Sequence, residues 1–369
     1  MFKRAAISAL VLVAACSDGV GPEHTRTSGP QFATTTGTGI VLDQQSGGMG
    51  QYGVHIGKGF DPVNPRHGDA IVATFFWFGS ANTITEVTDH LADGTPVGNH
   101  YTLVEYVTSG GLSMATYVAT NVQNFPEAND WNTVLDVHAI FSSPVQGSII
   151  ISAYRGVGSV SAAAIAAHAS SGGAASVPTM VGPGAIPVNQ NALVYAVTMS
   201  SAHGPAGQPA GFTSVSAMED TIMNVDAEYA VQGAAGSVEP QWAWYFSSPG
   251  SWVASAVALN PTVLHATFVS QPTRTMPFMK IQPPVQVAVV DELGNTVTSF
   301  NGSVTVAIGH NGGLVLQGTL SGTKTVNAVN GIATFSDLSI DQLGNGYTLT
   351  ANGAGLIGSE SAPFNIGLF

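Results

Sequence analysis

Short runs of apolar residues recur along most of this chain, and clusters of glycine, proline and small polar residues separate them. Residues 83–88 and 101–107 alternate between polar and apolar positions, which predicts strands with one buried face. Residues 70–78 (AIVATFFWF) are apolar except at Thr74, which predicts a strand in the middle of a packed sandwich. The spacing of such runs predicts an all-β fold in which residues 37–262 form a large, jelly-roll-like β-sandwich.

One stretch departs from the strand pattern. Residues 159–171 are rich in alanine and fit either a short helix or an irregular crossover between strands. We interpret His168, which lies in this stretch, as an exposed residue and not as a ligand. Residues 172–187 are rich in glycine and proline, which predicts a loop along the edge of the sandwich.

A second series of strand patterns begins after Asn260-Pro261. Residues 285–289 alternate up to the turn DELGN, and the motifs GIATFSDLSI (331–340) and GYTLTA (346–351) follow. In this order the motifs resemble bacterial immunoglobulin-like domains of the invasin/intimin type. The resemblance implies that residues 263–369 form an immunoglobulin-like β-sandwich, which acts as a spacer or adhesive module and not as a catalyst.

Individual positions in these motifs have a physical role as well. Phe335, Leu338 and Ile340 are spaced to fill a core between two sheets. Tyr347 lies where immunoglobulin folds place a tyrosine whose hydroxyl bonds back to nearby backbone. This stretch contains no cysteine, so we expect apolar packing alone to hold it together.

The first sixteen residues have the pattern of an export signal. Lys3 and Arg4 precede a short apolar run, which ends in Val-Ala-Ala-Cys at Cys16. The run is shorter than the roughly 20 residues that span a bilayer. The segment resembles a bacterial lipoprotein signal with its lipobox, which implies that residues 1–15 are removed and that Cys16 is acylated. Residues 16–36 are then a lipidated tether, and the protein is held in the bacterial cell envelope, at the outer membrane or the cell surface.

The amino-acid composition argues against nucleic acid as a binding partner. The chain has a net charge of −13, and only 8% of its residues are charged. Such a surface repels nucleic acid, because phosphate contacts depend on lysine and arginine. Cys16 is the only cysteine, so an intramolecular disulfide is impossible. We therefore expect a monomer without nucleic-acid partners, attached to the membrane through its N-terminal lipid.

A search for catalytic motifs finds none. The sequence contains no H-E-x-x-H and no P-loop, and residues 111–115 only approach the nucleophile pattern G-x-S-x-G. We therefore predict no catalytic residue and no cofactor. Glu86 and Glu105 are the two acids expected on paired strands, and they are the couple on which a glycoside-hydrolase alternative depends.

Two groupings of histidine with aspartate or asparagine offer potential metal ligands. Asp89-His90 and Asn99-His100 could converge across a hairpin closed by Asp93-Gly94, and Asp136 and His138 share one face of a strand. Either grouping could begin a metal site. An Asp/His pair on a sandwich is more often solvated surface, so we predict no metal site.

Aromatic residues give the strongest indication of a ligand site. Trp242, Trp244 and Phe246 share one face of a strand, which predicts core packing in preference to a row for stacking on sugars. Trp131 lies in a polar turn and is predicted to be exposed. The predicted ligand-binding residues are Trp131, Tyr52, His100 and Tyr101.

These observations predict a non-catalytic cell-surface lipoprotein for recognition or adhesion, with a glycan or protein ligand and an immunoglobulin-like spacer. The large domain also resembles uncharacterised extracellular bacterial β-sandwich domains, in residues 68–70, 84–89 and 252–261. That class implies a fold and a location but no activity. The alternative is a secreted hydrolase directed at polysaccharides.

Overall fold

The computed structural model describes residues 39–367, except residues 129, 176–178, 203–205 and 245–249. The described residues form an all-β protein of several sheets with one short helix, α1 (Ser161–Ala164). Cys16, the signal segment and the predicted tether lie outside the described residues.

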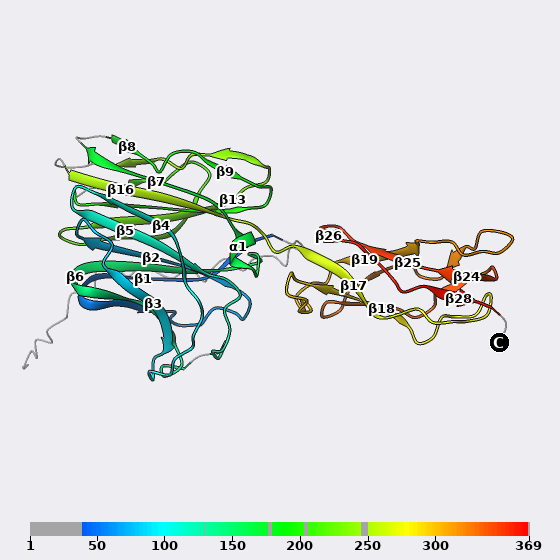
Figure 1. The fold of residues 1–369 in the computed structure, drawn as a ribbon. Helices are drawn as coiled ribbons and strands as arrows, with labels where there is room; N and C mark the ends of the chain where they lie inside the picture. The colour runs from blue at the N-terminus through cyan, green and yellow to red at the C-terminus, as the bar shows by residue number, and fades with distance from the viewer. Residues whose placement is uncertain (1–38, 129, 176–178, 203–205, 245–249, 368–369) are drawn as a thin grey trace, which may run out of the picture. The chain divides into compact units, whose positions relative to one another are not determined.

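The first large sheet has the strand order β1-β6-β2-β5-β4, and β3 also pairs with β6. Strand β6 is 21 residues long and changes partner along its length. Its first part pairs with β3 and its second part with β2 (Figure 1). The sequence alone predicts two strands here, from separate apolar runs at 133–141 and 148–154, and the structure joins these runs in one strand. The strands of this sheet are β1 (Val41–Gly59), β2 (Ala70–Phe78), β3 (Ile84–Leu91), β4 (Thr102–Ser109), β5 (Leu112–Ala119) and β6 (Leu135–Arg155).

The second large sheet has the order β12-β13-β10-β16-β7 and packs face to face against the first. Val72 and Phe76 of the first sheet share a buried core with Tyr195 and Val257 of the second. Two packed antiparallel sheets of this kind confirm the predicted β-sandwich. The strands of this sheet are β7 (Ile165–Ala175), β10 (Leu193–Ser200), β12 (Thr213–Glu219), β13 (Asn224–Val231) and β16 (Gly250–Leu259).

Both large sheets are also covered on their outer faces. Trp77 belongs to a second core on the far side of the first sheet, and Trp242 and Trp244 belong to a core on the far side of the second. All three tryptophans are fully buried, as predicted, while Phe246 lies outside the described residues. The covering strands of the second sheet form two small sheets: β8 (Thr179–Val181), β11 (Ala206–Gly207) and β15 (Trp242–Trp244), and β9 (Ile186–Val188) with β14 (Gly236–Val238).

Burial on two faces explains why β2 is apolar at almost every position. It lies between β5 and β6, and its side chains alternate between the two cores. Thr74, the single polar exception, is buried. Its hydroxyl oxygen lies 3.0 Å from the hydroxyl oxygen of Thr116 and 3.1 Å from that of Tyr195. The hydroxyl groups therefore satisfy one another inside the core.

The alanine-rich stretch at 159–171 is mostly strand. Helix α1 ends after four residues, and β7 continues from Ile165 to Ala175 along β16. The predicted loop at 172–187 is likewise interrupted by β8 and β9, so that prediction was wrong in part. The side chain of His168 is half-exposed, as expected, and its Nδ1 lies 2.7 Å from Oε2 of Glu105.

Residues 264–366 contribute a further core made only from this part of the chain. Phe335, Leu338 and Ile340 are buried in it, as predicted, and the Tyr347 hydroxyl donates to the Gln342 carbonyl at 3.1 Å. The strands are β17 (Leu264–Ser270), β18 (Val285–Val290), β19 (Ser303–Ile308), β20 (Leu320–Ser321), β21 (Thr325–Asn327), β22 (Ile332–Phe335), β23 (Ser339–Ile340), β24 (Gly344–Tyr347), β25 (Leu349–Asn352), β26 (Leu356–Ile357), β27 (Ser359–Glu360) and β28 (Phe364–Ile366).

These strands form two four-stranded sheets, in the orders β22-β18-β17-β26 and β21-β19-β25-β27, and two strand pairs. Side chains of both sheets share one core, so the arrangement is a β-sandwich, as the resemblance of this stretch implied. Whether the chain divides into separately folding domains at residue 262 remains a prediction.

Candidate functional site

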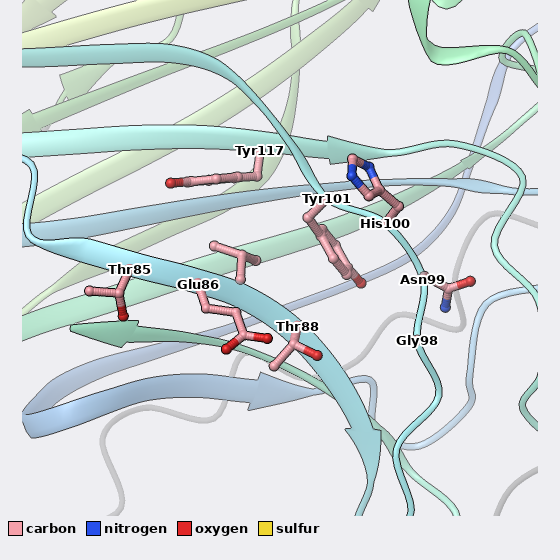
Figure 2. Close-up of a pocket in the computed structure, with 9 residues that line it drawn as sticks. Thr85, Glu86, Thr88, Gly98, Asn99, His100, Tyr101 and Tyr117 are labelled. Carbon is pink, nitrogen blue, oxygen red and sulfur yellow. The ribbon is translucent and has the colours of Figure 1, made fainter. Parts of the chain in front are cut away.

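A hollow of about 400 Å³ opens beside β3, where the chain leads from the β3 turn into β4 (Figure 2). Its volume lies in the usual range of small-ligand sites, roughly 300–1,000 Å³. We call it the β3 pocket. It is lined by Thr85, Glu86, Val87, Thr88, Gly98, Asn99, His100, Tyr101 and Tyr117.

A buried carboxylate shapes one wall of the β3 pocket. Asp89 is 1% exposed, and its Oδ1 accepts hydrogen bonds from the backbone N–H groups of Gly98, at 2.9 Å, and Asn99, at 3.1 Å. Its Oδ2 accepts from Asn99 Nδ2 at 2.7 Å and from the Tyr101 hydroxyl at 3.2 Å. Four donors on one carboxylate fix the segment that presents His100 to the pocket.

The tight turn before this segment is the one the sequence predicted. The Gly94 N–H donates to the Leu91 carbonyl at 2.8 Å, and Gly94 has a φ of +86°, which favours glycine. The turn brings Asp89 and Asn99 into contact. It does not bring His90 and His100 together, since the His90 ring contacts that of His138 and His100 lines the β3 pocket.

Two tyrosine rings form the apolar part of the pocket. Tyr101 and Tyr117 are each 8% exposed, and Figure 2 shows them across the hollow from Thr85, Glu86 and Thr88. Burial, with Asp89 nearby, raises the pKa of Tyr101 well above its usual value, and burial raises that of Tyr117. Both phenols therefore stay protonated at neutral pH.

The acid–base inventory of the pocket is small. Of the described residues that line it, Glu86 is the only one with a carboxylate, and it is exposed like His100. Hydrolysis of a glycosidic bond by the usual mechanism requires two carboxyl groups about 5–9.5 Å apart. The lining therefore suits binding through hydrogen bonds better than it suits hydrolysis.

The predicted couple of Glu86 and Glu105 is wrong. Strand β3 pairs with β6, whereas β4, which carries Glu105, pairs with β5. Glu105 accepts a hydrogen bond from Ser170 Oγ at 3.0 Å and contacts His168, both on β7. The error arose because consecutive strands often pair, and here they do not.

The four predicted ligand-binding residues do not form one site. His100 and Tyr101 line the β3 pocket, but Trp131 and Tyr52 do not. Trp131 is 81% exposed and Tyr52 is 78% exposed, which agrees with the exposure predicted for Trp131. Tyr52 lies on β1 opposite Gln146, and Trp131 lies in a turn where Asp130 Oδ1 accepts from the Asn132 N–H at 2.9 Å.

The strand pairing also gathers three potential metal ligands. His90 on β3 and Asp136 and His138 on β6 each offer one ligand atom, and these atoms all lie within 4.8 Å of one another. Burial and the neighbouring histidines lower the pKa of His138 to about 4, and burial raises that of Asp136. Sequence analysis grouped Asp136 with His138 but placed His90 with His100 instead, because only the pairing of β3 with β6 brings His90 to the pair.

A pair of buried acids escaped sequence analysis altogether. Asp226 and Glu228 on β13 are 5% and 2% exposed. Burial raises the pKa of Asp226 to about 6, and burial with the nearby Asp226 charge raises that of Glu228 to about 8. Gln208 Nε2 donates to Glu228 Oε2 at 3.0 Å. Polar residues alternate along this strand, as they do where one face of a strand is exposed. The layer that carries Trp242 covers that face in the structure.

Comparison with known proteins returns no match to a family model, a curated protein or a solved structure. None of the helical residues in the described part of the chain forms a segment long and apolar enough to cross a bilayer. The function must therefore be inferred from the chain's own geometry and chemistry.

Proposed function

We propose that this chain is a non-catalytic binding protein of the bacterial cell envelope and that it binds a glycan in the β3 pocket. The observation that carries the proposal is the lining, which sets hydroxyl, amide and carboxylate groups beside two tyrosine rings. A sugar presents hydroxyl groups at its edge and apolar C–H groups on its ring faces. Aromatic rings with a few placed polar groups match both.

The charge of the pocket and of the chain supports this class of ligand. Glu86 is an acceptor for sugar hydroxyls and opposes anionic ligands, and the chain's net charge of −13 opposes nucleic acid. Tyr101 is anchored by Asp89, so its ring needs no reordering when a ligand binds.

The rest of the proposal concerns how the pocket is displayed. Lipid at Cys16 would hold the chain at the membrane, as the resemblance of its N-terminus to a lipoprotein signal implies. Residues 263–369 would serve as an immunoglobulin-like spacer of the invasin/intimin type. The hydrogen bond of Tyr347 to the Gln342 carbonyl supports this likeness, since it matches the tyrosine corner of such folds.

A glycan array tests the binding function. We expect the protein to bind a restricted set of glycans, and we expect Glu86→Gln and His100→Ala each to weaken that binding about tenfold or more, as loss of one good polar contact does. Both residues are exposed, so neither change should impair folding. Tyr52→Ala is the matched control, because Tyr52 is exposed and lies outside the pocket.

Three results would contradict the proposal. The array could show no binding, or the pocket variants could bind as well as the wild type. Loss of binding in Trp131→Ala alone would move the ligand to the exposed tryptophan. Release of new reducing ends from a bound polysaccharide would instead favour the hydrolase alternative.

A further inference from the structure

We propose that His90, Asp136 and His138 bind a divalent transition-metal ion of the Zn²⁺ class on the first sheet. The site lies on the face of β6 opposite Leu135, Val137 and Ala139, which pack into the core. It uses none of the residues that line the β3 pocket, so it stands independently of the proposed glycan function.

The strand register places the three side chains on the same face. His90 lies directly opposite Asp136 in the antiparallel ladder of β3 and β6. Side chains that face each other across a ladder point to the same side of the sheet, and so do residues two apart on one strand. His138 follows Asp136 by two residues and therefore joins them. The ring centroids of His90 and His138 are 4.7 Å apart.

His90 makes the hydrogen bond that is usual for a metal ligand, and His138 has a buried ring nitrogen without a partner. His90 Nδ1 donates to the Leu91 carbonyl at 2.8 Å, which leaves the lone pair of Nε2 free to bind an ion. Histidines that bind metals usually donate their other ring N–H to a carbonyl or carboxylate in this way. Among the described residues, buried Nδ1 of His138 has no hydrogen-bond partner. A buried polar atom without a partner is costly, and a bound ligand relieves the cost.

The neighbouring strand keeps the site open. Gly57 and Gly59 of β1 lie opposite His138 and Asp136 in the register. A Cβ atom at Gly57 would lie 2.7 Å from His138 Cβ, closer than such atoms approach in proteins, and 3.0 Å from Asp136 Oδ1, which is closer than most such contacts. Glycine within a strand often marks a place where another group approaches closely. Here Gly57 leaves the space beside His138 and Asp136 unfilled.

The ligand atoms are near the separation that one ion requires. Two atoms bound to the same Zn²⁺ at about 2.0–2.2 Å are at most about 4.4 Å apart. Tetrahedral binding, the usual geometry of Zn²⁺, places two such atoms about 3.3–3.6 Å apart. The three atoms lie within 4.8 Å of one another, so the most distant pair would approach by about 1 Å when an ion binds. The ring centroid of the exposed His55 lies 5.9 Å from that of His138, so a further imidazole is close to the cluster.

The donor set selects the class of ion. Two imidazoles and one carboxylate suit Zn²⁺ and its neighbours in the first transition row, whereas Ca²⁺ and Mg²⁺ prefer oxygen ligands alone. Three protein ligands with an open fourth position also match the pattern of zinc sites that hold a water or an exogenous group.

Zinc titration of the untagged, metal-free protein tests the proposal, with a chromophoric chelator as competitor and the zinc content measured after dialysis. We expect one tightly bound ion per chain that excess Mg²⁺ or Ca²⁺ does not displace. Loss of a supporting hydrogen bond alone weakens metal sites by about 10–100-fold, so His90→Ala and His138→Ala should each weaken this site about 100-fold or more. Zn²⁺ should also raise the melting temperature of the wild type and not that of His90→Ala.

His100→Ala and His168→Ala are the matched controls, because both histidines lie outside the cluster and should leave the affinity unchanged. Asp136→Asn is the conservative variant, and the melting temperature of each metal-free variant checks that it folds. Equal zinc affinity in the wild type and in the folded His90→Ala and His138→Ala variants would overturn the proposal. So would the absence of any bound zinc at micromolar concentrations.

Discussion

The carboxyl groups of Asp226 and Glu228 are buried where ionisation is costly. Their pKa values in the folded protein, about 6 and about 8, lie above the values of 3.8 and 4.5 that the same groups have when exposed. Each group is neutral in the fold at a pH at which it is already charged in the unfolded chain. Both acids therefore stabilise the fold fully only in acid, and their contribution is lost as the pH rises.

The corresponding prediction is a decline in stability between about pH 4 and pH 8. The melting temperature of the wild type, measured at intervals across this range, should fall as the pH rises. Glu228→Gln should flatten the upper part of the curve, because glutamine cannot ionise. Part of the fall in melting temperature with pH should remain in this variant, since burial and nearby Asp43 also raise the pKa of Asp69 to about 8. If the melting temperature of Glu228→Gln fell with pH as much as that of the wild type, Glu228 would ionise freely in the folded protein.

At single positions, sequence analysis succeeded where the cue was local. The spacing of Trp242 and Trp244 was enough to predict burial, and the polar neighbours of Trp131 were enough to predict exposure. It did not group His90 with Asp136, and it missed the burial of Glu228, because the surroundings of both residues come from distant strands. A side chain's neighbours along the chain reveal its face, but they do not reveal what covers that face.

Strands show the same division between local and distant information. Apolar β2 and the alternating β3 and β4 were predicted because each carries a clear pattern. Strand β1 was not predicted, since its many glycines mask the pattern, and β6 was divided at its polar middle segment. The pairing of β3 with β6 depends on backbone contacts across more than forty residues of sequence, such as Leu91 with Leu135, and no local pattern specifies it.

Gly147 gives a test at this scale, because it lies where β6 runs beside Trp77 of β2. A Cβ atom there would lie 2.6 Å from the Phe76 carbonyl oxygen, which is backbone and cannot rotate away. Gly147→Ala should therefore destabilise the fold by about 1–3 kcal/mol, the usual cost of overpacking.

Urea unfolding of Gly147→Ala measures this cost. Gly233→Ala is the matched control, since nothing lies within 4 Å of a Cβ at that position, and its stability should be close to that of the wild type. Equal midpoints for all three proteins would mean that β2 and β6 can separate locally without penalty.

At the scale of the whole molecule, the core of residues 264–366 contains only side chains from that stretch. Valines of β18 and β19 pack there with Phe335 and Tyr347. We expect a fragment of residues 263–369 to fold alone with one cooperative transition, as single domains under about 150 residues usually do. Circular dichroism during thermal unfolding measures this, and a fragment without strand structure would refute a domain boundary at residue 262.

The lipid anchor is tested on the complete chain in a bacterial host. We expect the wild type in the membrane fraction with incorporated fatty acid, and we expect Cys16→Ser to lose both, because the lipoprotein proposal makes the Cys16 thiol the acceptor of the lipid. Fractionation and metabolic lipid labelling measure the two effects. A serine variant that keeps its label and its membrane association would remove the lipoprotein interpretation.

The covering of both large sheets on their outer faces has a consequence for how this fold can change. A sandwich with an open sheet face can change its specificity by exchanging side chains on that face. Here β2 and β10 are enclosed on both sides, so a substitution on either face of these strands disturbs a core. Substitutions are tolerated without loss of stability only at strand edges and connections, such as the exposed part of residues 92–100 beside β3. Natural substitutions that change the ligand should therefore accumulate in that connection, while the sequences of the enclosed strands change slowly.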